Sequence, residues 1–238
     1  VVGHRCGNHS GMPISLLCGV CKLCCCGGVF CGSCCTRGSR HNIALPRSVK
    51  DVERFGQRWV QQVLRVAGTG RETVDGVSVR PLGANGLLSG MAVVECTVTD
   101  DRGVPQPREF LVKVPAAGLA TRLTTDLFDL SYTEYMVYEL LSADLQEAGL
   151  RVPQRLCGDF NRKSGLYFLA MERVSASFPV TPLGQAVEDG MSLPEIHRCL
   201  RYLARWHAYF WGNPVKSRPE LGFIKTGAGP VMQVFFAE

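Results

Sequence analysis

The sequence predicts an α+β fold, in which five strands form an antiparallel sheet with one inserted helix and the start of a second, helical region follows. Three observations lead to this prediction. Short apolar runs rich in β-branched residues follow one another, one helical pattern separates the third from the fourth, and a long helical pattern comes after the last. Meandering strands with a single inserted helix favour an antiparallel sheet that is covered on one face.

A helix is expected ahead of the sheet, in the stretch SVKDVERFGQRWVQQVLRVAGTG. Ser48 can cap its start, with Asp51 three residues on, and Gly68 can end it. The apolar residues at helical spacing form one stripe, made of Val52, Phe55, Trp59 and Val63 and widened by Val60 and Leu64. Such a stripe is typical of a helix that buries one side.

Three strand-like runs follow, at 77–82, 91–99 and 109–114, and the loop TDDRGVPQP separates the last two. In the third run, Phe110, Val112 and Val114 alternate with Leu111 and Lys113. Because successive side chains of a strand point to opposite faces, Lys113 is expected on the face opposite Phe110.

The remaining elements are a second helix at 132–148 and two strands at 155–158 and 165–171, which the polar turn DFNRKS joins. Ser192 and Glu195 then form a capping box for a long helix. The apolar side of that helix carries Ile196, Leu200, Leu203 and Phe210.

Charge and cysteine are both concentrated at the N-terminal end. Residues 1–50 hold six Lys and Arg and no acid, so the other 188 residues, with 20 basic and 21 acidic side chains, give no indication of a nucleic-acid groove. Nine of the twelve cysteines lie in the first 35 residues, and the three others sit singly in apolar patterns, which suits a reducing, cytoplasmic environment. The sequence contains no run of eighteen uncharged apolar residues, so no membrane span is predicted.

Residues 1–45 are interpreted as a cysteine-rich head without a packed core, because glycine and cysteine dominate and few large apolar side chains offset chain entropy. Two pairs, Cys18 with Cys21 and Cys31 with Cys34, have zinc-ligand spacing, but four further cysteines compete for the same role. Adjacent cysteines beside basic residues could also be acylated at a membrane. The favoured interpretation is a disordered or spuriously translated leader.

A glycine-dotted turn, with Gly83, Gly86 and Gly90, lies between the first two strands. Glycine lets backbone N–H groups approach a phosphate, although this spacing is neither that of protein kinases nor that of a Walker loop. Lys113 could meet phosphates as a point charge, and Glu134 in the next helix could hold it. Taken singly, these are an ordinary turn, a surface lysine and a solvated carboxylate. Their order along the chain favours the joint, functional interpretation.

Four segments carry a family resemblance. FLVKV, EYMVYELL, YFLAMERV and LARWHAYFWGNP follow one another in an order that resembles the aminoglycoside phosphotransferase/choline kinase-like family, most closely its ecdysteroid-kinase-like branch. The resemblance runs from about Val49 to Phe223. It implies a protein-kinase-like fold, with residues 46–174 as the N-lobe, its preceding helix and the hinge, and residues 175–238 as the incomplete beginning of a helical C-lobe.

The resemblance also implies a nucleotide site. Residues 83–90 correspond to the phosphate loop, Lys113 to the ligand of the α- and β-phosphates, and Glu134 to its ion-pair partner.

Residues 171–174 correspond to the hinge, where backbone groups of Glu172 and Val174 would meet the adenine. Val79 and Val112 are the candidates for the apolar roof of that site. Met171 fits the hinge and fits equally well a buried strand residue.

Three other residues suggest chemistry less convincingly. Asp159 and Asn161, in the stretch GDFN, mimic a metal-binding motif but precede the expected hinge, so they are interpreted as turn formers. His207 falls on the apolar stripe of the last helix, where the family has a packing residue, and is interpreted as a core residue.

The family's catalytic loop, H-x-D-x-x-x-x-N, and its magnesium-binding aspartate are expected after the helix that contains Trp206. Nothing from 212 to 238 matches, because this stretch contains no Asp and no His. No catalytic residue and no metal ligand is therefore assigned. Without the remainder of that lobe, the apolar side of the helix at 196–210 is expected to be exposed.

The resulting hypothesis is a fragment of an ATP-dependent phosphotransferase that acts on the hydroxyl of a small-molecule acceptor. ATP and, in the full-length enzyme, Mg²⁺ are the implied cofactors. The polypeptide alone is expected to bind ATP weakly or not at all and to transfer no phosphate. Two alternatives remain open: a nucleotide-binding pseudokinase module without turnover, and a cysteine-rich metal-binding or interaction protein.

Overall fold

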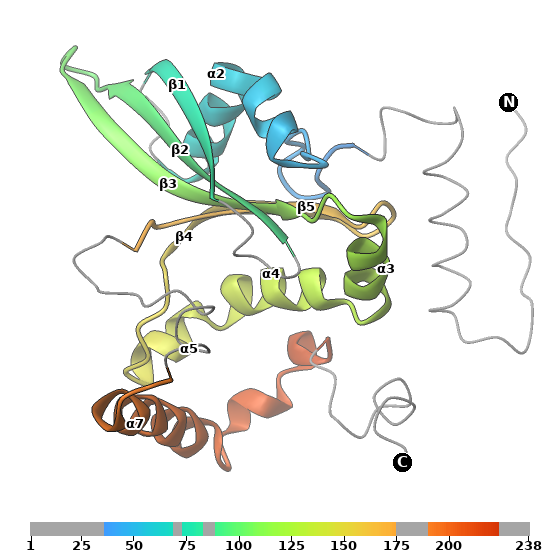
Figure 1. The fold of residues 1–238 in the computed structure, drawn as a ribbon, viewed down its shortest axis with the longest axis vertical. Helices are drawn as coiled ribbons and strands as arrows, with labels where there is room; N and C mark the ends of the chain where they lie inside the picture. The colour runs from blue at the N-terminus through green and yellow to red at the C-terminus, as the bar shows by residue number, and fades with distance from the viewer. Residues whose placement is uncertain (1–35, 69–72, 83–88, 175–189, 224–238) are drawn as a thin grey trace, which may run out of the picture.

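The computed structural model describes residues 36–68, 73–82, 89–174 and 190–223 (Figure 1). The helices of these residues are α2 (Val49–Val66), α3 (Leu119–Leu127), α4 (Leu130–Leu140), α5 (Ser142–Glu147) and α7 (Leu193–Phe210), followed by short 3-10 turns at Pro214–Ser217 and Pro219–Leu221. The strands are β1 (Thr73–Leu82), β2 (Ser89–Thr99), β3 (Pro105–Pro115), β4 (Arg155–Asn161) and β5 (Leu166–Met171).

The five strands form one antiparallel sheet in the order β1-β2-β3-β5-β4, which confirms the predicted α+β class and the predicted sheet. β1 and β3 are longer than their apolar patterns predicted, because pairing with β2 continues to Thr73 and Pro105, both opposite Thr99. The β2–β3 turn is closed by Asp100, whose Oδ1 accepts hydrogen bonds from the backbone N–H of Arg102 and of Val104. In the strand order given above, β3 is the middle strand of the sheet.

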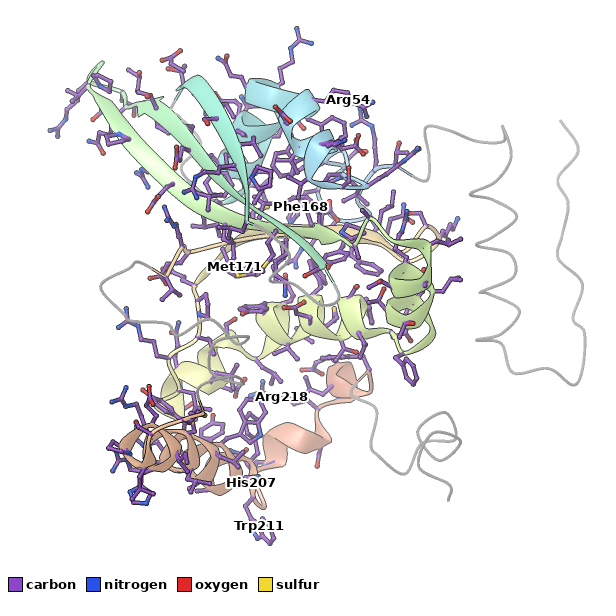
Figure 2. All side chains as sticks on the ribbon, viewed as in Figure 1. Arg54, Phe168, Met171, His207, Trp211 and Arg218 are labelled. Carbon is purple, nitrogen blue, oxygen red and sulfur yellow. The ribbon has the colours of Figure 1, made fainter. Side chains whose placement is uncertain are left out.

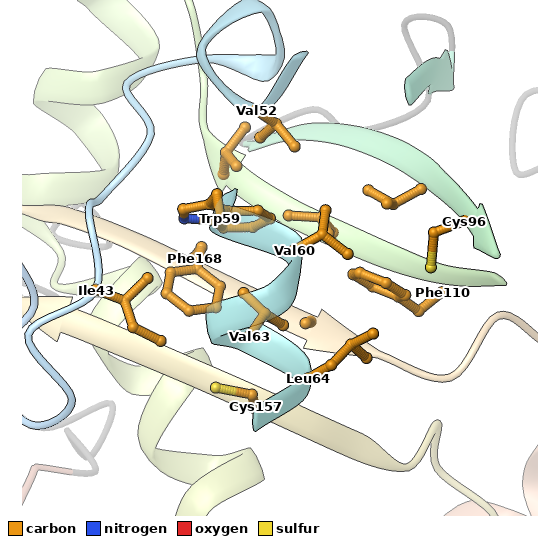
Figure 3. Packing of buried hydrophobic residues seen from close by; sticks show 14 of the residues in the cluster. Ile43, Val52, Trp59, Val60, Val63, Leu64, Cys96, Phe110, Cys157 and Phe168 are labelled. Atoms are coloured by element: carbon orange, nitrogen blue, oxygen red, sulfur yellow. The ribbon is translucent and has the colours of Figure 1, made fainter. Parts of the chain in front are cut away.

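Helix α2 covers one face of the sheet and forms the main hydrophobic core with it (Figure 3). Most of the predicted stripe is buried, namely Val52, Trp59, Val60, Val63 and Leu64. Trp59 packs edge-on against Phe168 of β5, with the ring centroids 5.0 Å apart, and its Nε1–H donates to the carbonyl oxygen of Ala44 at 2.8 Å. Gly56 interrupts the helix with a positive φ of 56°, a conformation that glycine adopts without a steric penalty.

The start of α2 differs from the prediction. The side chain of Ser48 makes no capping hydrogen bond, and the carboxylate of Asp51 accepts instead from the backbone N–H of Arg47, at 2.9 Å. The helix ends at Val66, and Gly68 follows with a positive φ of 92°, as expected of a glycine at a helix end.

Three helices lie between β3 and β4, so the prediction of one inserted helix is wrong. The expected helix at 132–148 is divided into α4 and α5 at Leu141, whose φ of −113° departs from helical values, and the sequence pattern did not reveal α3. α3 reads LATRLTTDL, and its three threonines are weak helix formers. Figure 1 shows α4 on the side of the sheet opposite α2, so the sheet is covered on both faces rather than on one.

The first ten described residues pack against the sheet. Ile43 and Leu45 are almost fully buried in the core around α2, and Arg37 and Ala44 form an isolated antiparallel bridge. The prediction that residues 1–45 lack a packed core is therefore wrong for residues 36–45, while residues 1–35 and their nine cysteines lie outside the described part. Within the core, burial raises the pKa of Cys157 to about 12, so this thiol stays neutral.

The capping box of α7 is confirmed, because the carboxylate of Glu195 accepts from the backbone N–H of Ser192 at 2.8 Å. The exposure of the apolar side is also confirmed for Ile196, Leu200 and Leu203, but Phe210 is half-buried and packs against the cluster that contains Leu141 and Leu221. His207, interpreted as a core residue, is exposed, so that interpretation is wrong (Figure 2). Within the described residues, no helix has the length and apolar character needed to cross a membrane.

Asp159 and Asn161 lie in β4 rather than in the turn after it. Asn161 nevertheless shapes the turn as predicted, because its Oδ1 accepts from the backbone N–H of Lys163 and of Ser164. Asp159 does not: its fully buried carboxylate accepts from backbone N–H groups of the distant segment 36–45. The interpretation of Asp159 as a turn former is therefore wrong.

Candidate functional site

The candidate site is centred on Lys113 in the middle strand of the sheet. Lys113 pairs with Met91 of β2 on one side and with Leu169 of β5 on the other. Its neighbours Val112 and Val114 are fully buried in the core against α2. Since side chains alternate along a strand, Lys113 points to the face that α4 covers, as predicted.

Glu134 of α4 meets Lys113 on this face. Its Oε1 forms an ion pair with the Nζ of Lys113, which confirms the predicted pairing. The Lys113 side chain is 18% exposed and that of Glu134 34%. The pair is thus partly sheltered from solvent, and Glu134 is the more exposed of the two side chains.

Two tyrosines border the carboxylate of Glu134 and were not identified from the sequence. Burial first, and then the negative charge of Glu134, raises the pKa of Tyr138 and of Tyr167. Both hydroxyls therefore stay protonated, and that of Tyr167 donates to the carbonyl oxygen of Val114 at 3.4 Å. Tyr167 lies within the continuous apolar run of the predicted strand at 165–171, and that pattern predicted the strand alone.

Of the three glycines of the predicted phosphate loop, Gly83 and Gly86 lie outside the described residues. Gly90 belongs to β2, opposite Val114. A Cβ at this position would lie 3.1 Å from a methyl carbon of Val114 and 3.3 Å from one of Val49. Close packing of β2 against β3 and α2 is therefore a sufficient reason for glycine at position 90.

The predicted apolar roof is on the wrong face of the sheet. Val79 and Val112 pack against α2, on the side opposite Lys113. Register places Leu111 and Val93 opposite each other on β3 and β2, and Met171 opposite Leu111 on β5. These three apolar residues share the face of Lys113.

The predicted hinge begins where β5 ends. Met171 is buried, and the backbone N–H of Glu172 donates to the carbonyl oxygen of Gln154 at 2.7 Å. The carboxylate of Glu172 in turn accepts from the backbone N–H of Gln154 at 3.1 Å. Arg173 forms an ion pair with Glu109 of β3, and Val174 is exposed. The segment is therefore tied to its neighbours up to Arg173.

No group of three or more His, Cys, Asp or Glu side chains converges as a metal site in the part of the chain that the structure describes. None of the five histidines in the sequence is followed two positions later by Asp, so the sequence contains no H-x-D pattern. The chain matches no family model, no curated protein and no solved structure.

Proposed function

We propose that the residues around Lys113 form one half of an ATP site, in a phosphotransferase that acts on the hydroxyl of a small molecule. The observation that carries this proposal is the ion pair of Lys113 with Glu134, on the central strand and at a partly open face. An ammonium has three N–H donors, and one carboxylate oxygen leaves donors for phosphate oxygens. Glu134 would keep the ammonium of Lys113 in place and leave some of its N–H donors free for phosphate oxygens.

The base of the nucleotide would lie against the apolar residues beside Lys113. Leu111 and the buried Met171 share its face of the sheet, and the half-buried Leu111 offers the apolar surface that can stack against an adenine ring. Because the N–H of Glu172 is already bonded to Gln154, its carbonyl oxygen and the backbone of Val174 are the hinge groups that would meet the adenine edge.

No magnesium ligand is proposed among the described residues. Magnesium prefers carboxylate oxygens together with phosphates, and the carboxylate of Glu134 is engaged by the ammonium of Lys113. The role proposed for this half of the site is therefore to bind and orient the nucleotide. Lys113 would hold the phosphates, and the apolar face would hold the base.

A second candidate function is nucleotide binding without turnover. It rests on the same ion pair of Lys113 with Glu134, which would bind phosphates without taking part in their transfer. Transfer of phosphate to any member of a panel of small alcohols would favour the phosphotransferase over this alternative.

The binding test is an ATP titration of the full chain and of the Lys113→Met variant. Because a hydrogen bond to a charged group contributes about 1.5–3 kcal/mol, the variant is expected to bind ATP at least tenfold more weakly. Lys163→Met is the matched control, since Lys163 is an exposed lysine in the β4–β5 turn, and its affinity should equal that of the unmodified chain. Equal affinities for the Lys113→Met variant and the control would contradict the proposal.

A further inference from the structure

Residues 36–45, called the strap below, are hydrogen-bonded to β4. The strap closes on itself through hydrogen bonds from the N–H of Gly38 to the carbonyl of Ile43 and from the N–H of Leu45 to that of Thr36. Both the N–H and the Oγ of Ser39 donate to the carbonyl oxygen of Phe160 in β4, the latter at 2.7 Å. The strap therefore covers part of the outer edge of the sheet.

A buried carboxylate fixes the tip of the strap. Asp159 is fully buried, and its two carboxylate oxygens accept from the backbone N–H of Arg40 at 3.1 Å and of His41 at 2.8 Å. The approach is so close that a Cβ on Gly38 would lie 1.9 Å from the carboxylate, so only glycine fits there. The backbone at Arg40 is consequently held in one position on the sheet.

The side chain of Arg40 reaches from this fixed point to α4. It forms an ion pair with Glu139, which also pairs with Arg155 of β4 through a contact of 2.7 Å between Nη1 and Oε2. Glu139 is only 11% exposed. Ion pairs thus hold helix α4 to the sheet at Glu139, through the strap and β4, and at Glu134, through Lys113, while the buried ring of Tyr135 packs between them against Phe160 of β4.

We infer that Arg40 is a positioning residue, which sets the place of α4 on the sheet and thereby the pairing of Glu134 with Lys113. The two glutamates are five positions apart, about 7.5 Å along a helix, so a stiff helix carries a shift at one to the other. The strap would then control how firmly the ammonium is held. Only the consequence for nucleotide binding rests on the function proposed above.

The test measures the pairing of Lys113 without a nucleotide. The full chain is acetylated with a limiting amine-directed reagent, and the rate at each lysine is read by peptide mass spectrometry. Loss of a partly exposed ion pair shifts the equilibrium between the paired and the unpaired state of a residue by about two- to fivefold. Arg40→Ala should therefore speed acetylation of Lys113 by that factor, Arg40→Lys should restore most of the protection, and Lys163 should react at an unchanged rate in all variants.

Arg54→Ala is the matched control, because Arg54 is a more exposed arginine that pairs with Asp51 within α2. It should leave the rate at Lys113 unchanged. Glu139→Gln removes the same contact from the other side and serves as the second variant should Arg40→Ala misfold. An unchanged rate at Lys113 in a folded variant of either kind would overturn the inference. An ATP affinity insensitive to Lys113→Met would instead contradict the proposed function and leave this result standing.

Discussion

Replacing Trp59 by alanine is expected to lower the free energy of unfolding by about 3–5 kcal/mol, the usual cost of deleting a large buried aromatic side chain. Trp59 is 2% exposed and lies at the centre of the α2 core, edge-on to Phe168. The substitution also removes the donor to the carbonyl oxygen of Ala44, the residue between the two buried side chains of the strap. The loss should therefore loosen α2 and the strap together. The free energy of unfolding is measured by urea denaturation, which is followed by the circular dichroism of the backbone because that signal does not depend on tryptophan.

Two substitutions separate the causes. Trp59→Phe keeps most of the ring contacts and loses the hydrogen bond, so it should cost about 1 kcal/mol beyond any change in packing. Trp211→Ala alters an exposed tryptophan just after α7 and should stay within about 0.5 kcal/mol of the unmodified chain. If Trp59→Ala were no more destabilising than Trp211→Ala, the assignment of Trp59 to the core would be wrong.

Asp159→Ala is expected to destabilise the chain by about 2–4 kcal/mol, because it leaves one buried and two part-buried backbone donors without an acceptor. The carboxylate accepts from Arg40, His41 and Phe160, and two of these N–H groups belong to the strap. Release of the strap should expose the peptide bond after Arg40, so limited trypsin digestion should cleave there faster in the variant.

Asp159→Asn is the matched control for size. The amide keeps one acceptor oxygen but turns its NH₂ group toward the other donors, so both the stability and the rate of cleavage after Arg40 should lie between those of the unmodified chain and of Asp159→Ala. Cleavage after Arg40 at the unmodified rate in Asp159→Ala would show that other contacts hold the strap.

The sheet and the pairing of Lys113 with Glu134 were predictable because their signals are local. Alternation along β3 places Lys113 opposite Phe110 whatever the rest of the fold does. The following helical pattern then brings a carboxylate over the free face. The five strands were found for the same reason, since each carries its own run of apolar residues.

The strap and the role of Asp159 were not predictable, because the partners lie far apart in the sequence. A single aspartate at the start of a polar turn gives no indication that it will accept hydrogen bonds from the N–H groups of residues 40 and 41. α3 was missed because its threonine-rich sequence has weak helix propensity, and tertiary packing overrides such a preference.

The predicted roof residue Val112 was wrong because adjacent residues of a strand point to opposite faces of the sheet. Val112 precedes Lys113 and must lie on the opposite face, while Leu111, two positions before it, shares the face of Lys113. Counting by twos from Lys113 would have selected Leu111. The burial of Val112 against α2 makes the correction plain, because α2 and α4 lie on opposite sides of the sheet.

The most direct measurement of the central claim is the protection of Lys113 from acetylation by ATP. In the unmodified full chain, ATP should slow modification of Lys113, whereas adenosine, which has no phosphates, should protect it far less. Lys163 should react at the same rate with and without either compound, and it controls for effects on the reagent. Much stronger protection of Lys113 by ATP than by adenosine is the result the account predicts. Equal rates at Lys113 with and without ATP would contradict it.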